Sequence, residues 1–552
     1  MTGAEALVES LISEGVDTVF GIPGSKFLDV LDAMWFKRDR IRFITTRHEQ
    51  GAAFMAMGLA MARKSVGVCY ATLGPGTTNL TTGLADAYKN AVPVVALGGM
   101  MASYHLGRDG WQEIDQAGVL RAVTKESSVV PNAQSIPLYI RRAFRIATSN
   151  LPGPIYLTMP MDQLTASVEY TAEDEKSSFY RPTVLPEYAA DGLIMKQIIS
   201  LLNDAKNPVI LTGREVNWEA AGSELLKVAE RFNVPVLTTL EGHGGLTTSH
   251  PLVLGPTSKS GGWPVAVECL KKADLVLAIG VKFDFHGTGF DYAVLPRQAT
   301  LIHISGHPEF IGTNFPAHMA LVASVKRFAR DLLNEASGVA LTERNQQPWQ
   351  DKMSAWRLSR QQAVENCRAA SPIKPQLVAA ALNRYTDGDA FFVFDGGNFK
   401  KFLVQQMEFP RQGMVFKDDG FGCVGSSFPI ALGYKVGRPG CRVFCATGDM
   451  GYLLNGQELE TAVRENIPVI TLIFNDYGLG NIREYQNRKH EGRQIGVDFS
   501  AVDYAAVARA FGAYGERVEK AEDVEPAIKR AVESGRPAVL DILVDKQQLA
   551  AK

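Results

Sequence analysis

The stretch GDMGYLLNGQELETAVRENIPVITLIFND, residues 448–476, contains the pattern that decides the fold. A Gly-Asp pair ends one apolar run, a single helix is expected over 453–465, and the next apolar run ends in Asn-Asp. Strands joined through a helix lie parallel, and ligands of such sheets bind at the carboxyl ends of the strands. Asp449 and Asp476, 27 positions apart (476 − 449), are therefore expected to meet at one edge of a sheet.

The same alternation of strands and helices runs through the chain of 552 residues. We predict three blocks, at 1–166, 189–336 and 371–545, because one hydrophobic core does not extend over this length. Apolar runs such as VPVVALGG, ADLVLAIG and AFFVFDGG are nearly continuous, which indicates parallel sheets buried on both faces. The predicted fold is α/β with three doubly wound parallel-sheet domains, a linker at 167–188 and a charged helical connection at 343–370.

Composition and charge argue against several kinds of partner. Lys plus Arg number 57 against 59 Asp plus Glu, so nucleic acid is not an expected partner. The chain has no run of about 18 apolar residues, so no membrane span is expected. Its first helix lacks the basic and apolar regions of a signal peptide, and the six cysteines form no CxxC pair. We expect a cytoplasmic protein with reduced cysteines.

Glycines surround both carboxylates, at Gly448 and Gly451 and again at Gly478. Alone, each aspartate would be explained as a helix cap or a turn residue. Together, at neighbouring strand ends, they offer the oxygen ligands that Mg²⁺ takes along with substrate phosphates. Free N–H groups at the start of the following helix would hold a diphosphate. The stretch therefore predicts a site for a metal ion and a phosphorylated ligand.

This spacing resembles the motif of thiamine-diphosphate-dependent enzymes, Gly-Asp-Gly followed some two dozen residues later by Asn-Asn. The resemblance implies thiamine diphosphate and Mg²⁺ as cofactors, with Asp449, Asp476 and the Gly478 carbonyl as metal ligands. Met450 and Gly451 would contact the cofactor beside them. Met450 replaces the third glycine of the motif and Asp476 its second asparagine, a substitution associated with catabolic acetolactate synthases.

A second stretch, RHEQGAAFMAMGLAMARK (47–64), resembles the glutamate motif of the same family. A glutamate in the first turn of a helix is otherwise explained by the helix dipole. In the family it binds N1′ of the aminopyrimidine and starts deprotonation of the thiazolium C2, which assigns that role to Glu49. The Ala- and Met-rich surroundings suit a carboxyl that shares a proton with a neutral ring. Gly76 and Asn79, in the following ATLGPGTTN, would lie near the cofactor.

Two further segments complete the resemblance. DGGNF (395–399) resembles the loop that holds the diphosphate, through Gly397 and Asn398. GFGCVGSSFPIALG (420–433) resembles the pyrimidine loop, with the Gly422 carbonyl and the Val424 amide as contacts. The three blocks would then be an N-terminal pyrimidine-binding, a middle Rossmann-like and a C-terminal diphosphate-binding domain. Because the family shares its sites between subunits, the resemblance implies a homodimer or homotetramer.

Within the family, GIPGSKFLDVLDA (21–33) and DGWQEIDQ (109–116) look most like acetolactate synthases. This implies decarboxylation of pyruvate and ligation to a second 2-oxo acid, with Glu49, Lys26 and Gln112 as catalytic residues. The residues expected to contact substrate are Ser25, Lys26, Leu73, Gln112 and Tyr485. GVKFDFHGTGF (280–290) resembles a flavin region, but Ser305 and His307 stand where flavin-binding relatives have acids. FAD is left open and is not favoured.

Several alternatives remain open. The segment around Leu73 has no histidine like that of benzoylformate decarboxylases, and the N-terminal motif lacks the His-His pair of pyruvate decarboxylases. Glu49 argues against glyoxylate carboligases, which lack it. 2-Hydroxyacyl-CoA lyases, sulfoacetaldehyde acetyltransferases and enzymes of the benzoylformate decarboxylase type stay as alternatives. A dehydrogenase would need a GxGxxG turn that the chain does not fit, and an inactive regulatory subunit would be expected to lose Glu49 or the metal ligands.

Overall fold

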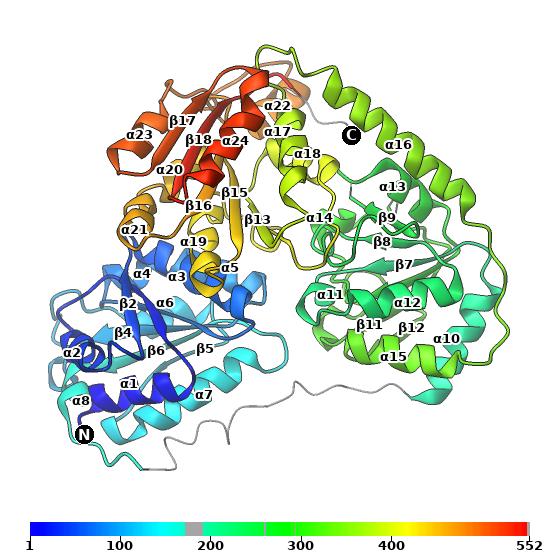
Figure 1. Cartoon of the computed structure of the whole chain (residues 1–552). Coiled ribbons are helices and arrows are strands. Elements are labelled where there is room, and N and C mark those ends of the chain that lie inside the picture. Colours follow the sequence, from blue (N-terminus) through cyan, green and yellow to red (C-terminus); the bar gives the residue numbers. More distant parts are fainter. Residues whose placement is uncertain (172–190, 259–260, 293, 549–552) are drawn as a thin grey trace.

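A computed structural model describes residues 1–171, 191–258, 261–292 and 294–548. It contains three parallel six-stranded sheets flanked by helices (Figure 1), which confirms the predicted α/β fold. Most of the predicted linker at 167–188 lies outside the described residues. Within the described ranges, no helix is both long enough and apolar enough to cross a membrane.

The first sheet has the strand order β2-β1-β3-β4-β6-β5. Helix α1 precedes it and begins with a capping box, in which Thr2 and Glu5 each accept the other's backbone N–H. The strands are β1 Thr18–Gly21, β2 Arg42–Thr45, β3 Gly67–Ala71, β4 Val94–Met100, β5 Glu126–Val129 and β6 Ile155–Pro160. The helices are α1 Gly3–Ser13, α2 Leu28–Phe36, α3 Glu49–Arg63, α4 Pro75–Asn79, α5 Thr81–Lys89, α6 Gln116–Arg121, α7 Ile136–Thr148 and α8 Met161–Thr165.

The third sheet repeats this order, as β14-β13-β15-β16-β18-β17. Its strands are β13 Ala390–Phe394, β14 Val415–Lys417, β15 Arg442–Gly448, β16 Val469–Asn475, β17 Tyr514–Val518 and β18 Ala538–Leu543. Its helices are α17 Pro375–Leu382, α18 Asn398–Gln406, α19 Ser427–Gly437, α20 Asp449–Asn455, α21 Glu458–Arg464, α22 Gly480–Lys489, α23 Tyr504–Ala510 and α24 Val524–Glu533. The chain changes direction across the sheet between β13 and β15, which is where ligands of such sheets bind.

The expectation of one helix over 453–465 is wrong. The chain instead forms α20 and α21, separated by Gly456 and Gln457. The break turns the buried Glu458 toward the first domain, where its carboxylate accepts the backbone N–H groups of Arg47 and His48 at 3.0 Å each. The helical pattern of the sequence gives no indication of this contact between Glu458 and the first domain.

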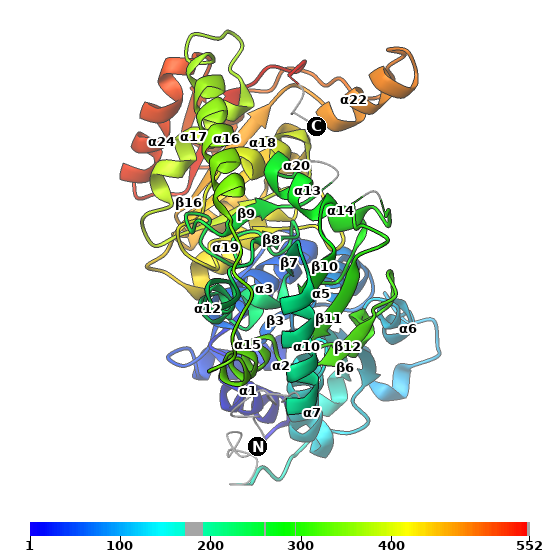
Figure 2. The ribbon, with the colours of Figure 1, turned by 90° about the vertical axis from the view of Figure 1, so that its right-hand side faces the viewer.

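The middle sheet has the order β12-β11-β10-β7-β8-β9, the order of dinucleotide-binding folds. Its strands are β7 Pro208–Thr212, β8 Val236–Thr238, β9 Val253–Pro256, β10 Leu275–Ile279, β11 Thr300–Ser305 and β12 Met319–Val322. Its helices are α10 Gly192–Asp204, α11 Glu215–Trp218, α12 Gly222–Phe232, α13 Pro264–Lys271, α14 Phe285–Thr288 and α15 Val325–Glu335. The predicted helical connection is α16, Gln347–Glu365, which runs along the outside of the middle and third domains (Figures 1 and 2).

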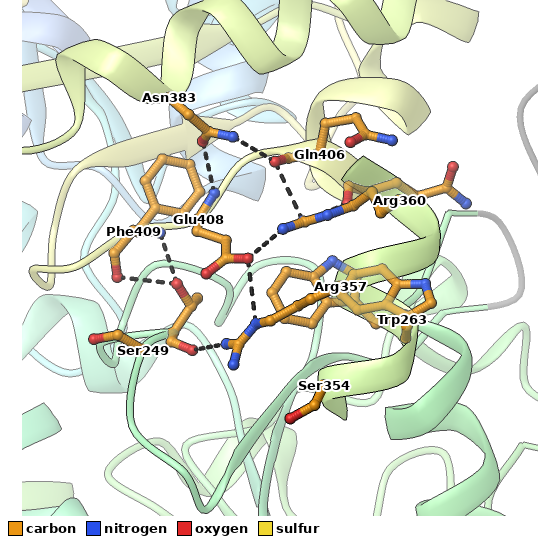
Figure 3. A network of polar contacts seen from close by, with 12 residues as sticks. Ser249, Trp263, Ser354, Arg357, Arg360, Asn383, Gln406, Glu408 and Phe409 are labelled. Atoms are coloured by element: carbon orange, nitrogen blue, oxygen red, sulfur yellow. Dashed lines mark hydrogen bonds and ion pairs between the residues drawn. The ribbon is translucent and has the colours of Figure 1, made fainter. Parts of the chain in front are cut away.

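Polar contacts from three separate segments fix the end of α18 (Figure 3). Arg360 of α16 donates to the carbonyl of Gln406 at 3.2 Å, and Asn383 donates to the same carbonyl at 2.7 Å. The indole N–H of Trp263, in the middle domain, donates to the carbonyl of Val404 at 2.9 Å. The last carbonyls of a helix have no partners within the helix. These contacts therefore satisfy the C-terminal end of α18, whose N-terminal end lies at the carboxyl edge of the third sheet.

Helices α3 and α19 join the first and third domains in one hydrophobic core. A Cβ atom on Gly58 would lie 2.1 Å from the carbonyl oxygen of Ile430, and one on Gly433 would lie 1.9 Å from that of Met55. Only glycine permits such an approach of two backbones. The closest point of contact between the two domains therefore depends on one glycine from each helix.

Candidate active site

Asp449 and Asp476 come together at the carboxyl edge of the third sheet. Asp449 opens α20 after β15, Asp476 follows the neighbouring β16, and the Gly478 amide contacts both carboxylates. Burial, and secondly the charge of Asp476, raises the pKa of Asp449 to about 7. Burial also raises the pKa of Asp476, although the charge of Arg483 opposes this. Two buried carboxylates that repel each other are a suitable environment for a cation.

Arg483, which sequence reasoning missed, is part of this arrangement. Its buried guanidinium lies 3.1 Å from an Asp476 oxygen and 3.0 Å from an Asp498 oxygen. Gly480 leaves room for this geometry, since a Cβ there would lie 2.4 Å from Asp476 Oδ2. Arg483 therefore balances the negative charge that aspartate adds over asparagine at position 476. Its position seven residues after Asp476, on the helix that follows, was the available signal.

The described residues contain no group of three or more His, Cys, Asp or Glu side chains that could hold a metal. Mg²⁺ does not require one, because it commonly takes one or two carboxylates together with water and substrate phosphates. Two carboxylates and the nearby Gly478 backbone are thus a donor set that fits Mg²⁺.

The loop after β13 lies beside this pair, because β13 and β15 are neighbouring strands. Asp395 accepts hydrogen bonds from the amides of Gly396 at 2.7 Å and Gly425 at 3.0 Å, and burial raises its pKa to about 6. Gly397 and Asn398 follow and begin α18. The structure therefore brings the two predicted diphosphate residues to the same edge as Asp449.

The predicted pyrimidine loop reaches this edge as well. Gly422 has a φ of +74°, which favours glycine, and open space surrounds the position that its Cβ would take. The Val424 side chain is 39 % exposed. A Cβ on Gly396 would lie 3.6 Å from Val424 Cγ2, so Val424 stands directly over the turn after β13.

Glu49 opens α3 in the first domain and is only 7 % exposed. The side-chain amide of Asn79 donates to its Oε2 at 2.9 Å. A Cβ on Gly76 would lie 3.1 Å from its Oε1, so Gly76 allows the turn after β3 to approach the carboxylate. The structure thus places these three predicted residues together.

The predicted substrate residues of the first domain lie at the carboxyl edge of its sheet. Lys26 lies against Gly99 at the end of β4, because a Cβ added to Gly99 would come within 3.2 Å of Lys26 Cβ. Gln112 has a φ of +64° and covers the turn after β3, since a Cβ on Gly74 would lie 2.5 Å from its carbonyl. Nearby, Ser25 is exposed and Leu73 is buried.

Gln116 is a second residue that sequence reasoning missed. Its buried side chain accepts the Gly74 amide at 2.8 Å and donates to the Gly99 carbonyl at 2.9 Å. It thereby ties the turn after β3 to the end of β4. A glutamine at the start of a short helix gives no sequence signal for these contacts, because both partners lie in other segments.

Tyr485 is not brought to the other substrate residues within one chain. It lies on α22, is 44 % exposed, and has the guanidinium of Arg488 5.0 Å from its ring centre. Both views place α22 at the end of the molecule away from the first domain (Figures 1 and 2).

Three family models match the chain in the order of its three sheets. The thiamine pyrophosphate enzyme N-terminal TPP binding domain matches residues 1–119, the central domain 195–332 and the C-terminal TPP binding domain 395–542. The chain belongs to the thiamine pyrophosphate enzyme family. Thiamine pyrophosphate is thiamine diphosphate, so the resemblance stated from the sequence is confirmed.

Relatives of known name cover nearly the whole of this thiamine pyrophosphate enzyme. It is 33 % identical to the probable acetolactate synthase large subunit of Methanococcus aeolicus, over 99 % of this chain and 92 % of that protein. It is 33 % identical to the acetolactate synthase large subunit of Haemophilus influenzae, over 99 % of this chain and 95 % of that protein. It is 32 % identical to the acetolactate synthase isozyme 3 large subunit of Escherichia coli, with the same two shares.

Proposed function

We propose that this thiamine pyrophosphate enzyme decarboxylates pyruvate and ligates the remaining two-carbon unit to a second 2-oxo acid, as an acetolactate synthase does. The observation that carries the proposal is its 33 % identity, over 99 % of its length, to acetolactate synthase large subunits. A match of this extent includes all three domains, so it bears on substrate as well as on cofactor.

The residues at the two sheet edges fit thiamine diphosphate and Mg²⁺. When bound, the cofactor supplies a nucleophilic carbon that adds to a 2-oxo acid and accepts the electrons left when CO₂ departs. Asp449, Asp476 and the Gly478 carbonyl would hold Mg²⁺, and the repulsion between the two buried carboxylates supports this assignment. The residues that would hold the diphosphate are Gly397, Asn398, Met450 and Gly451.

Glu49 would hold a proton at N1′ of the aminopyrimidine. Its burial and the hydrogen bond from Asn79 support this role, because they fix the carboxylate in one orientation. Gly76 would keep the turn after β3 close to the Glu49 carboxylate. On the opposite side, the Gly422 carbonyl and the Val424 amide would bind the ring.

For substrate, we propose that Lys26 attracts a 2-oxo acid carboxylate and that Gln112 orients the bound substrate. Ser25 and Leu73 would complete this part of the pocket, and Tyr485 would line the acceptor side. A bound acceptor competes with a free proton, and effective molarities of about 10⁵–10⁸ M indicate how far positioning can favour ligation.

We further propose a homodimer or homotetramer in which two chains share each site. The remoteness of α22 from the first domain supports this, since Lys26 and Gln112 need a partner chain to meet Tyr485. We propose a cytoplasmic location and the domain boundaries 1–166, 189–336 and 371–545.

The middle domain does not fit FAD. Glu215, after β7, accepts the Ser305 hydroxyl at 2.6 Å and the Gly306 amide at 2.8 Å, at the carboxyl ends of the sheet. Glu219 accepts the amides of Val325 and Lys326 at the start of α15. Donors of this kind would otherwise be available to a nucleotide phosphate. We therefore propose a flavin-free enzyme.

The test is purified protein with pyruvate, thiamine diphosphate and Mg²⁺, without added flavin, followed for CO₂ and acetolactate. Both products are expected in the presence of both cofactors, and mass spectrometry of ligand released from denatured protein should detect no FAD. CO₂ accompanied only by acetaldehyde would indicate a decarboxylase. No turnover of pyruvate would contradict the proposal and direct the search to acyl-CoA, sulfonated or aromatic substrates.

A further inference from the structure

Two buried carboxyl groups meet where the first and third domains are in contact. Asp86 lies on α5 and is 0 % exposed, and Asp418 follows β14 and is 2 % exposed. The side-chain amide of Asn90 donates to Asp86 Oδ1 at 2.8 Å and to Asp418 Oδ1 at 3.0 Å. One asparagine therefore holds together two acids that are 332 positions apart (418 − 86).

Asp418 holds the loop that would bind the aminopyrimidine. Its carboxylate accepts the amides of Phe421 at 3.3 Å, Gly422 at 3.1 Å and Cys423 at 2.5 Å. Asp395 takes the Gly425 amide from the other side of the loop. The Val424 amide, proposed above as a ring contact, lies between these two anchors.

The number of donors indicates which acid of the pair is ionised. Asp418 receives three backbone N–H groups and the Asn90 amide, which stabilise a carboxylate. Asp86 Oδ2 is buried and has no donor among the described residues, although Asp418 lies within hydrogen-bonding reach of the Asp86 carboxyl. A buried oxygen beside a carboxylate is satisfied when it carries the proton and donates it.

The acids around Asp86 act in the same direction, while the cations Lys400 and Arg214 act on Asp418 and favour its charged form. Burial, then the charge of Asp418 and more weakly that of Asp395, raises the pKa of Asp86 well above its ordinary range. Cys423, the further titratable group that faces it, is also an acid. Asn90, on its own helix, is the neutral donor that opposes the shift.

We propose that Asp86, as the neutral acid, is a positioning residue that donates a hydrogen bond to Asp418 and so fixes the 421–425 loop for the aminopyrimidine. The assignment of the loop to that ring rests on the function proposed above. The contact between α5 and the loop does not depend on it. Loss of the proton would place two carboxylates side by side and release the loop.

The chain offers a variant that separates the hydrogen bond from the acid. Asp86→Asn keeps an N–H donor toward Asp418 and an oxygen acceptor toward Asn90, and it cannot ionise. Asp86→Ala removes the donor and leaves Asp418 with one partner fewer. Asp204→Asn, an exposed position at the end of α10, is the matched control.

Hydrogen–deuterium exchange of the 419–427 peptide, without any cofactor, tests the contact itself. We expect faster exchange in Asp86→Ala, and wild-type exchange in Asp86→Asn and Asp204→Asn. Amide exchange has an intrinsic increase with pH. In wild type, the exchange rate of this peptide should rise by more than this intrinsic increase, whereas in Asp86→Asn it should rise by the intrinsic increase alone. Unchanged exchange in Asp86→Ala, or equal acceleration in both Asp86 variants, would overturn the proposal.

Calorimetric titration of thiamine diphosphate with Mg²⁺ present tests the link to the cofactor. Asp86→Ala loses a hydrogen bond to a charged group and should bind thiamine diphosphate at least about tenfold more weakly, while Asp86→Asn should bind it like wild type. Wild-type protein that does not bind thiamine diphosphate would contradict the proposed function, while the exchange experiment would still decide on the contact. Unaltered binding by Asp86→Ala would exclude a role toward the cofactor.

Discussion

At the scale of single residues, acidic side chains at strand ends supply the groups that we propose for metal binding and proton transfer. Asp449 and Asp476 lie at neighbouring strand ends, and the burial that raises their pKa values makes a bound cation favourable. Glu49 occupies the same kind of position in the first domain, after β2 and at the start of α3. In each case a strand brings the carboxyl group to the edge and the following helix orients it.

Replacement of the two metal-site acids should have unequal effects. Asp449→Ala removes an oxygen ligand, and since loss of even an outer-shell partner costs about 10–100-fold, we expect at least about 100-fold weaker binding of thiamine diphosphate and Mg²⁺. Asp476→Asn keeps an oxygen and should retain binding within about tenfold, a range that allows for the Arg483 charge that residue 476 then no longer balances. Calorimetric titration would measure both. Equal loss in the two variants would mean that Asp476 does more than ligate the metal.

Glu215 should make stability depend on pH. Burial raises its pKa from 4.5 to about 7, so the folded protein keeps a proton that the unfolded chain releases. The stabilisation is complete below pH 4.5 and is lost as pH rises through 7, by about 3 kcal/mol. Glu215→Gln removes this pH-dependent loss. The free energy of unfolding of the variant should therefore increase relative to that of wild type between pH 5 and pH 8. Urea titrations at several pH values would measure the gain, with Glu522→Gln, an exposed site, as control; parallel curves would contradict the assignment.

Sequence reasoning found the residues that combine a strand end with a motif, such as Asp449 and Glu49. It did not find Arg483, Gln116 or Asp86. A charged residue on a polar helix, a glutamine at the start of a short helix and an acid on an amphipathic helix each read as ordinary surface positions. Their partners lie in other segments, so only the folded chain reveals their contacts.

At the scale of elements, the central strands were predictable and several edge strands were not. β7, β10 and β16 are apolar runs buried along their whole length. β17 is a half-exposed edge strand with polar residues, so its sequence lacks the continuous apolar pattern. β12 is apolar but is a half-exposed edge strand of only four residues, Met319–Val322. The presence of helices between the strands was also predicted from the sequence. The division of 453–465 into two helices was not, because a contact with another domain produces it.

The crossing of α3 and α19 should be sensitive to single added methyl groups. A Cβ on Gly433 would lie 1.9 Å from the Met55 carbonyl, whereas one on Gly440, just beyond the same helix, would meet no atom within 4 Å. Gly433→Ala should therefore lower the free energy of unfolding by about 1–3 kcal/mol, the usual cost of overpacking, or more. Gly440→Ala should have little effect. Chemical denaturation measures both, and equal effects would mean that the helices separate without strain.

At the scale of the whole molecule, two of the three sheets supply the residues of the proposed active site. Glu49 and Asn79 belong to the first sheet, and Asp449 and Asp476 to the third. α22 extends away from the first domain (Figure 2). The middle domain and α16 fix the end of α18 from outside and thereby support the third sheet.

Two inactive variants should restore activity when mixed, if two chains share each site. Glu49→Gln disables the acid of the first domain, and Asp449→Ala disables the metal site of the third. A mixed dimer would contain one site with both defects and one site with neither, so about a quarter of wild-type activity is expected after equilibration of equal amounts. Subunit exchange followed by the acetolactate assay measures this. Absence of recovery, with exchange verified by mass spectrometry, would place each site within one chain.

The reciprocal crossing of α3 and α19 also bears on how such an enzyme arose. Each helix follows the second strand of its sheet, the two sheets share one strand order, and Gly58 over Ile430 mirrors Gly433 over Met55. Such reciprocity is the signature of a twofold axis between equal partners, here retained inside one polypeptide. Fusion into one chain frees the two halves to diverge. One helix now begins with Glu49 and the other follows the 421–425 loop, so a symmetric ancestor would account for the proposed division of labour between proton transfer and ring binding.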